Sequence, residues 1–286
     1  MQLLDLYKKY QALQPEQKEF VKTRKVEGTY KIKDWLSFFK EVAIFDEILD
    51  QTRDSLQEEP KRGRLWLAFF VIGIALSFLV ENVMLGLLLA TPIFLLVFGL
   101  AKLLKKIDLS NGLRLHLIPL LMLFHEEAGG QSKLELSVDA SNIIDHKAYL
   151  VRKKERPITA VKSKWDFFYE NTWAQGKLTF EDSTQVKWEI FSAIRHRLKM
   201  KSGRKRGSEF KVKHSIRCKV AMPQSRYALS EPENAEVPCQ EKNGYWVFKV
   251  KGDETSTDPY QCMSVQTSIK AIIKAYQQVR RQSEAA

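Results

Sequence analysis

The chain has 286 residues, 44% of them hydrophobic and 28% charged, and its 46 Lys and Arg outnumber its 34 Asp and Glu to give a net charge of +12. This length allows one or two domains, and the basic excess favours an anionic partner: lipid headgroups, nucleic acid or an acidic protein. Its three cysteines form no CxxC pair, so neither a disulfide framework nor a zinc site is predicted. The first residues lack the apolar core of a signal peptide.

Residues 1–60 are predicted to form a helical segment on the cytoplasmic side of a membrane. Short helices are expected over residues 2–14 and 15–25, with Pro15 in the first turn of the second. Asp34 is the expected N-cap of a longer helix that runs to about Gln57. One face of that helix is apolar and the other acidic, which favours packing on the C-terminal domain or another subunit over lying on lipid. The acidic face is predicted to carry Glu41, Asp46, Glu47 and Asp50.

Residues 61–106 are predicted to form a transmembrane helical hairpin. Between residues 65 and 101 the only ionisable side chain is Glu81. As one helix this stretch would be about 55 Å long, nearly twice the bilayer core, so it is expected to fold back at Glu81–Asn82 into helices 65–80 and 83–101. Lys and Arg flank the hairpin but are absent from its turn, which predicts an integral membrane protein with both termini cytoplasmic, in the inner membrane if bacterial. Small residues are expected to let its helices pack closely: Gly73, Ser77, Gly86 and Ala90.

Residues 107–130 are predicted to hold an amphipathic helix, whose apolar part, residues 113–124, is too short to cross a bilayer. Two interpretations stay open. The segment is either an interfacial helix along the headgroups, with Arg114 and His116 facing water, or a core helix of the domain that follows.

Residues 131–286 are predicted to form a cytoplasmic β-rich domain. Residues 134–138 alternate apolar with polar side chains, residues 173–180 and 185–191 form an expected hairpin, and Asn243–Gly244 is the strongest hairpin turn signal. A C-terminal helix over 258–281 is expected to begin at Asp258 and to bury Val265, Ile269, Ile272, Ile273, Tyr276 and Val279. The predicted fold class is therefore a membrane protein with a two-helix transmembrane hairpin and an α+β cytoplasmic region, comprising an antiparallel β-rich domain and a C-terminal helix.

Most of the net charge comes from residues 193–222, whose two halves alternate apolar with basic side chains. This period of two predicts a β-ribbon, two antiparallel strands joined by a basic tip, with both basic faces on one side of the sheet. Because opposed like charges destabilise a sheet, we interpret the basic face as an anion-binding surface; the alternative is a solvated edge that its lysines protect against aggregation. The predicted anion-binding residues are Arg195, Arg197, Lys199, Lys201, Arg204, Lys205, Arg206, Lys211, Lys213, Arg217 and Lys219.

The sequence contains no Walker, HExxH, GxSxG or GxGxxG motif, and no cofactor or metal is predicted. His196 and His214 lie on the apolar faces of the ribbon strands, where they either oppose each other or are ordinary core histidines. The aromatic residues between Trp165 and Trp173 indicate a β-domain core in preference to a ligand site.

The leading functional hypothesis is a non-enzymatic, membrane-anchored binding or scaffold module, whose basic β-ribbon engages anionic lipid headgroups or an acidic protein. Nucleic acid is a less favoured partner, because no recognised nucleic-acid motif accompanies the charge. A homo-oligomer is compatible with the pattern. Two alternatives stay open: an oligomeric pore or transport subunit built from the hairpin, and an enzyme with an unrecognised site.

Overall fold

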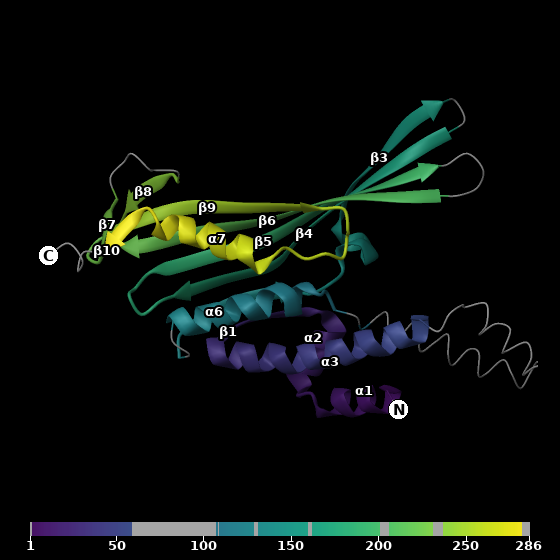
Figure 1. Cartoon of the computed structure of the whole chain (residues 1–286), viewed down its shortest axis with the longest axis horizontal. Helices are drawn as coiled ribbons and strands as arrows, with labels where there is room; N and C mark the ends of the chain where they lie inside the picture. The colour runs from purple at the N-terminus through teal and green to yellow at the C-terminus, as the bar shows by residue number, and fades with distance from the viewer. Residues whose placement is uncertain are drawn as a thin grey trace, which may run out of the picture. The chain divides into compact units, whose positions relative to one another are not determined.

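Figure 1 shows the computed structural model of the chain, which describes residues 2–58, 107, 109–128, 131–159, 162–200, 206–230 and 237–281. The chain divides into two compact units. The first consists of Met1–Lys22 and Glu41–Asp108, and the second of Thr23–Lys40 and Leu109–Ala286. Each unit is described by itself.

The described part of the first unit is helical. It contains α1 (Gln2–Ala12), most of α2 (Pro15–Thr23) and the C-terminal part of α3 (Ile32–Glu58). Phe20 and Phe45 are buried here, and the ring of Tyr10 lies 5.7 Å from that of Phe45. Asp46, predicted on the exposed acidic face of α3, is completely buried, so that part of the prediction is wrong.

The second unit is built on an antiparallel sheet, in which the described strands follow the order β1-β2-β4-β5-β6-β9-β8 and β3 pairs with β4. A separate pair is formed by β7 (Tyr227–Leu229) and β10 (Val279–Arg281). The strands of the main sheet are β1 (Lys25–Lys31), β2 (Lys133–Asp139), β3 (Leu150–Thr159), β4 (Lys162–Thr179), β5 (Gln185–Met200), β6 (Arg206–Pro223), β8 (Cys239–Lys242) and β9 (Tyr245–Ser256).

Several predicted strands are confirmed, although their first and last residues differ from the predicted ones. The alternation of residues 134–138 corresponds to β2, whose Leu134, Leu136 and Val138 are buried. The predicted hairpin over 173–191 is the β4–β5 pair, and Asn243 and Gly244, both with positive φ, make the β8–β9 turn. Local turn chemistry therefore marked both connections correctly.

Strand β1 was missed, because the alternation in residues 25–31 is weak: Val26 and Tyr30 are its only large apolar residues, and Gly28 lies between them. It pairs with β2 from Lys25 opposite Asp139 to Lys31 opposite Lys133, a partner more than 100 residues away in the chain. Helix α3 consequently begins at Ile32 instead of Asp34. A propensity for strand often depends on the neighbouring strand more than on the residues themselves.

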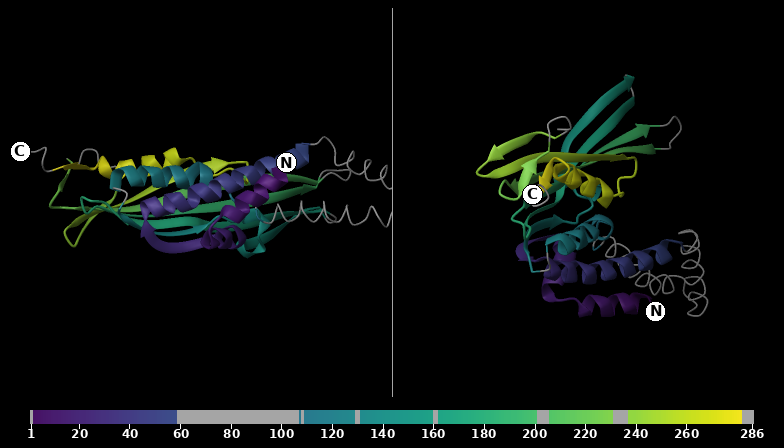
Figure 2. Two further views of the ribbon diagram at one scale, coloured as in Figure 1. Left: turned by 90° about the horizontal axis from the view of Figure 1, so that it is seen from below. Right: turned by 60° about the vertical axis from the view of Figure 1, so that its left-hand side comes forward.

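Helices cover one face of the sheet, which we call the covered face. Figure 2 shows α6 (Ile118–Ala128) and α7 (Val265–Tyr276) along this face, and a π-helical turn, Leu113–Leu117, precedes α6. The sheet side chains beneath them are buried, among them Trp188, Ile190, Cys218 and Phe248. We call the opposite side of the sheet the open face.

The segment 113–124 is a core element of this unit. His116, predicted to face water, is completely buried; its Nδ1 lies 2.7 Å from the carbonyl of Met263 and its Nε2 lies 3.0 Å from Oγ of Ser268. The core interpretation is therefore the one that the contacts support. The polar partners of His116 are thus about 150 residues away in the chain, where the local sequence pattern could not indicate them.

Helix α7 is shorter than predicted, and its predicted apolar stripe is only partly buried. Ser264 is its N-cap, since its side chain accepts from the backbone N–H of Gln266, and the helix ends at Tyr276. Its buried residues are mostly small, namely Ser268, Ala271, Ile272 and Ala275, whereas Ile273 is 45% exposed. The predicted apolar stripe is correct for Ile272, whereas Val265, Ile269 and Tyr276 are only half-buried and Ile273 is exposed. Small side chains take the most buried positions because α7 approaches the sheet closely: a Cβ at Gly252 would lie 3.0 Å from the carbonyl of Thr267.

The predicted fold class is wrong for the part of the chain that the structure describes, where antiparallel sheet dominates. Within those residues no helix is both long and apolar enough to cross a membrane. Helix α3 has sufficient length but carries charges throughout, and α6 is apolar but has only 11 residues. The integral membrane localisation with cytoplasmic termini, which was inferred from the hairpin, is corrected with it. Residues 65–101, including Gly73, Ser77, Gly86 and Ala90, lie outside the described residues.

Gly176 on β4 allows Trp188 on β5 to lie flat on the covered face. A Cβ atom at position 176 would lie 2.7 Å from Cζ2 of Trp188. We expect Gly176→Ala to lower the free energy of unfolding by about 1–3 kcal/mol, because the ring must move in a packed core. Urea unfolding measures this, with Gly112→Ala as the control, since a Cβ there would meet Trp173 at an ordinary 3.4 Å. Equal effects of the two substitutions would contradict the steric account.

Candidate anion-binding face

The predicted β-ribbon is the β5–β6 pair, and its register is confirmed. Arg195 pairs with Lys211 and Lys187 with Lys219, so odd-numbered positions of both strands lie on one side. The even-numbered residues from Val186 to Ile194 and from Val212 to Met222 are buried on the covered face, whereas His196, Leu198 and Phe210 nearer the tip are half-buried. Both sets of basic side chains therefore lie on the open face, as the period of two requires.

The two histidines of the ribbon do not oppose each other. In the observed register His196 pairs with Phe210, and their rings stack at 4.4 Å, whereas His214 pairs with Ser192. The Ser192 hydroxyl lies 2.8 Å from Nδ1 of His214, and burial lowers the pKa of His214. Each histidine is thus part of the local packing around its own strand partner.

Three of the predicted anion-binding residues form ion pairs within the protein. Arg197 Nε lies 3.1 Å from Oδ1 of Asp166 on β4, Lys213 Nζ 3.4 Å from Asp253 on β9, and Arg217 Nη1 3.0 Å from Glu189 on β5. The charge count for residues 193–222 did not include these acids, because Asp166 and Asp253 lie on other strands and Glu189 lies before residue 193. The structure thereby lowers the number of cations that are available to a ligand.

The other predicted residues divide into two groups. Arg195, Lys211 and Lys219 lie on the open face and form no ion pair with a described residue. Lys201, Arg204 and Lys205 lie outside the described residues, and the side chains of Lys199 and Arg206 are likewise not described.

Four lysines align across four neighbouring strands of the open face. Lys177 on β4 pairs with Lys187 on β5, Lys187 with Lys219 on β6, and Lys219 with Lys249 on β9. All four are exposed, and none forms an ion pair with a residue that the structure describes. At about 4.8 Å between strands this lysine row spans roughly 14 Å. Of these four lysines only Lys219 was predicted, because the row depends on the registers of three strand pairs.

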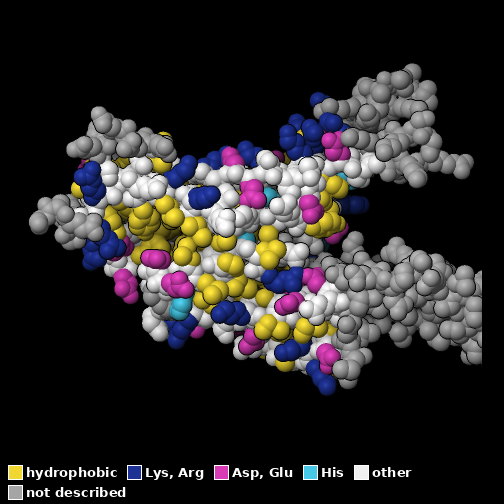
Figure 3. All heavy atoms as spheres, in the orientation of Figure 1, with side chains coloured by type: hydrophobic (Ala, Val, Ile, Leu, Met, Phe, Trp, Pro, Cys, Tyr) yellow, Lys and Arg dark blue, Asp and Glu magenta, His cyan; other side chains and the backbone are white. Residues whose placement is uncertain are grey.

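A second cationic row crosses the part of the sheet where β3 joins β4, β5 and β6. Arg152 pairs with Phe168, Phe168 with Arg195, and Arg195 with Lys211. The Arg152 guanidinium lies 4.3 Å from the Phe168 ring centroid. Figure 1 shows these strands projecting beyond the helices of this unit, and Figure 3 shows Lys and Arg gathered on them. We call this set the distal row; its Arg152 lies on a strand whose basic residues the sequence analysis did not single out.

Between the two rows the open face carries an aromatic ring. Phe191 on β5 pairs with Ser215 on β6 and is half-buried. The Arg217 guanidinium lies 5.8 Å from its centroid. The ring therefore lies on the same side of the sheet as both cationic rows.

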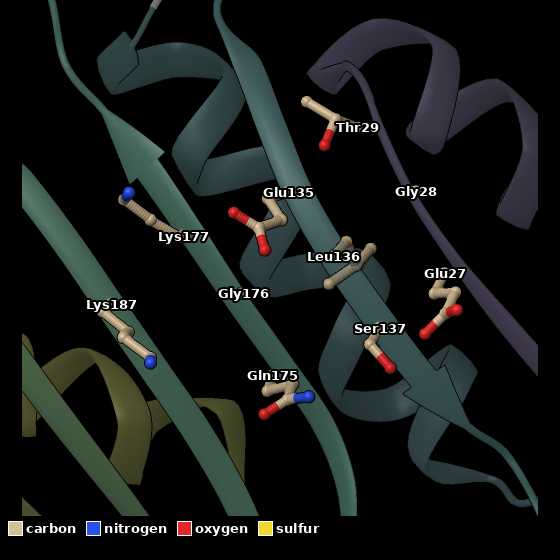
Figure 4. Close-up of a pocket in the computed structure, with 10 residues that line it drawn as sticks. All are labelled: Glu27, Gly28, Thr29, Glu135, Leu136, Ser137, Gln175, Gly176, Lys177 and Lys187. Atoms are coloured by element: carbon tan, nitrogen blue, oxygen red, sulfur yellow. The ribbon is translucent and has the colours of Figure 1, made fainter.

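A groove of about 490 Å³ borders the lysine row on the side of β1 and β2. Figure 4 shows Lys177 and Lys187 at one side of it, Glu135 between the strands, and Glu27 near β1. The two carboxylates place negative charge beside the lysine row. An anion on the open face is accordingly favoured along β4 to β9 and disfavoured toward β1.

The aromatic residues between Trp165 and Trp173 do not form one site. Trp173 is 8% exposed and lies 5.6 Å from His116 in the core. Trp165 and Phe167 are half-buried on the projecting strands, with Lys153 Nζ 4.0 Å from the Trp165 centroid. The preferred core interpretation holds for Trp173 alone.

Among the described residues, no group of three or more His, Cys, Asp and Glu is arranged to hold a metal ion. No family model matches the chain, and neither a curated protein nor a solved structure shows significant similarity to it.

Proposed function

We propose that this protein is a binding module that engages an anionic macromolecule through the open face of its sheet. The observation that carries the proposal is the lysine row, in which three consecutive strand pairs each set two lysines opposite each other. Each opposed pair costs on the order of 0.2–1 kcal/mol. An anionic ligand that bridges the lysine row would offset this repulsion, which explains why four lysines are aligned there.

The position of the strands argues against protection of a sheet edge. Lysines defend edge strands because an edge exposes unpaired backbone groups. Strands β5 and β6 lie in the interior of the observed order, and at Lys187, Arg195 and Lys219 the strand is paired on both sides. Before Val212, β6 is paired with β5 alone. Edge protection can therefore account for Lys211, but not for Lys187, Arg195 and Lys219, which lie on strand segments that are paired on both sides.

The test uses the full chain with four open-face cations neutralised together: Lys187→Gln, Lys219→Gln, Arg195→Gln and Lys211→Gln. We expect the affinity for an anionic probe to fall by about tenfold or more, because these side chains supply the attraction, while the thermal midpoint is unchanged or raised. The probes are single-stranded DNA, polyglutamate and vesicles of anionic lipid, each at low and high salt.

A matched control removes four exposed lysines elsewhere: Lys8→Gln, Lys9→Gln, Lys270→Gln and Lys274→Gln. The net charge of the two variants is identical, so a specific open-face site predicts near-normal binding by the control. If wild type binds none of the probes at low salt, or if both variants lose binding equally, the proposal is wrong.

A further inference from the structure

The open face alternates cations and aromatic rings along the β5 strand. Lys187, Phe191 and Arg195 are four residues apart and share one side of the sheet. At about 3.4 Å per residue, the lysine row and the distal row are about 27 Å apart along the strand. Phe168 lies opposite Arg195 in the distal row. The order along the face is therefore lysine row, ring, and then a row of cations with a second ring.

From this arrangement we infer that the open face binds single-stranded nucleic acid. The inference rests on the proposed function, and it names the partner. A single strand offers phosphates to the cations and unstacked bases to the rings, and base–aromatic stacking tolerates any sequence. An acidic polypeptide offers carboxylates without planar bases. A duplex keeps its bases stacked on each other, and a vesicle surface has none.

The arginines next to the rings fit the same partner. Arg152 lies over Phe168, and Arg217 lies near Phe191. A guanidinium plane stacks on bases as well as on aromatic side chains, and it reaches phosphate oxygens with two N–H groups. The face holds acids as well: Glu189 pairs with Arg217, and Asp253 pairs with Lys213 and Lys251. Glu170 and Glu209 also lie on this face, two residues from Phe168 and Lys211 respectively. Because Arg217, Lys213 and Lys251 are already paired with acids, we assign the phosphates to the lysine row and the distal row.

The deciding experiment compares two oligomers of equal charge on the full chain. One is oligo-dT of about 12 nucleotides, and the other is an abasic deoxyribose-phosphate chain of the same length. Wild type should bind oligo-dT more tightly than the abasic chain. Phe191→Leu and Phe168→Leu should each weaken oligo-dT binding by about fivefold or more, because stacking on the ring is lost. Neither should change binding of the abasic chain.

Phe167→Leu is the matched control, since Phe167 neighbours Phe168 on β4 but lies on the other side of the sheet, next to the ring of His196. It should leave oligo-dT binding unchanged. Phe191→Tyr keeps the ring and should retain binding, which separates loss of stacking from loss of fold.

The salt dependence of binding tests the lysine row independently. Replacing Lys187 and Lys219 together with Gln should reduce the magnitude of the slope of log affinity against log salt concentration by about 1.4, or 0.7 for each phosphate contact.

The outcomes separate the two proposals. If wild type binds oligo-dT and the abasic chain equally and the Phe variants change neither, the open face is a plain anion surface, and this inference is overturned while the proposed function stands. Tighter binding to polyglutamate or to anionic vesicles than to oligo-dT at equal salt also overturns it. Absence of binding to every anionic probe overturns the proposed function itself.

Discussion

Replacing Arg197 with Gln is expected to lower the free energy of unfolding by about 3 kcal/mol. The Arg197 Nε donates to Oδ1 of Asp166 at 3.1 Å. The Asp166 side chain is 0% exposed, and that of Arg197 is 23% exposed. Loss of the guanidinium removes a cation from beside a completely buried carboxylate, which costs more than the pair contributes.

The exposed ion pair between Arg217 and Glu189 on the same face provides the comparison for the Arg197→Gln variant. Arg217→Gln removes the partner of Glu189, but those side chains are 60% and 37% exposed, so a loss of at most about 1 kcal/mol is expected. The double variant Asp166→Asn with Arg197→Gln should recover most of the stability. Urea unfolding at constant m-value measures all three variants. Similar small losses for Arg197→Gln and Arg217→Gln would show that burial of Asp166 does not control the result.

Acidification from pH 7 to pH 4 is expected to remove about 3 kcal/mol of stability through His116 alone. Burial lowers the pKa of His116 from its ordinary 6.5 to about 4. The folded protein therefore holds the neutral imidazole, which donates through Nδ1 to the carbonyl of Met263 and accepts at Nε2 from the Ser268 hydroxyl. This contribution is complete above pH 6.5 and is lost as the pH falls toward 4, because the unfolded state takes up the proton first.

The His116→Gln variant isolates this contribution, since an amide keeps hydrogen-bonding capacity but does not titrate in this range. We expect the variant to be less stable than wild type at pH 7 and to show a flatter dependence on pH between 6.5 and 4. The quantity compared is the difference between the two curves, because carboxylates add their own acid dependence to both. Parallel curves would mean that His116 is protonated as easily in the folded state as in the unfolded state.

The role of Arg197 illustrates what the sequence does and does not reveal about the candidate site. The alternation of residues 193–222 placed this residue correctly on the basic side of the ribbon. Its ion pair was not predictable, since Asp166 lies 31 residues earlier and faces it only through the β4–β5 register. A function assigned to Arg197 from charge alone therefore mistakes a partly buried structural pair for a binding residue.

By itself, the sequence determined the local features: which side chains of β2, β5 and β6 share a face, and where the Asn243–Gly244 turn lies. These depend on neighbours in the chain, because the side-chain period of a strand is two and a two-residue turn needs positive φ. Only the tertiary structure decided the pairing of β1 with β2, the small-residue face of α7, and the lysine row. Each of these is set by strand or helix partners far away in the sequence, whose registers no local pattern specifies.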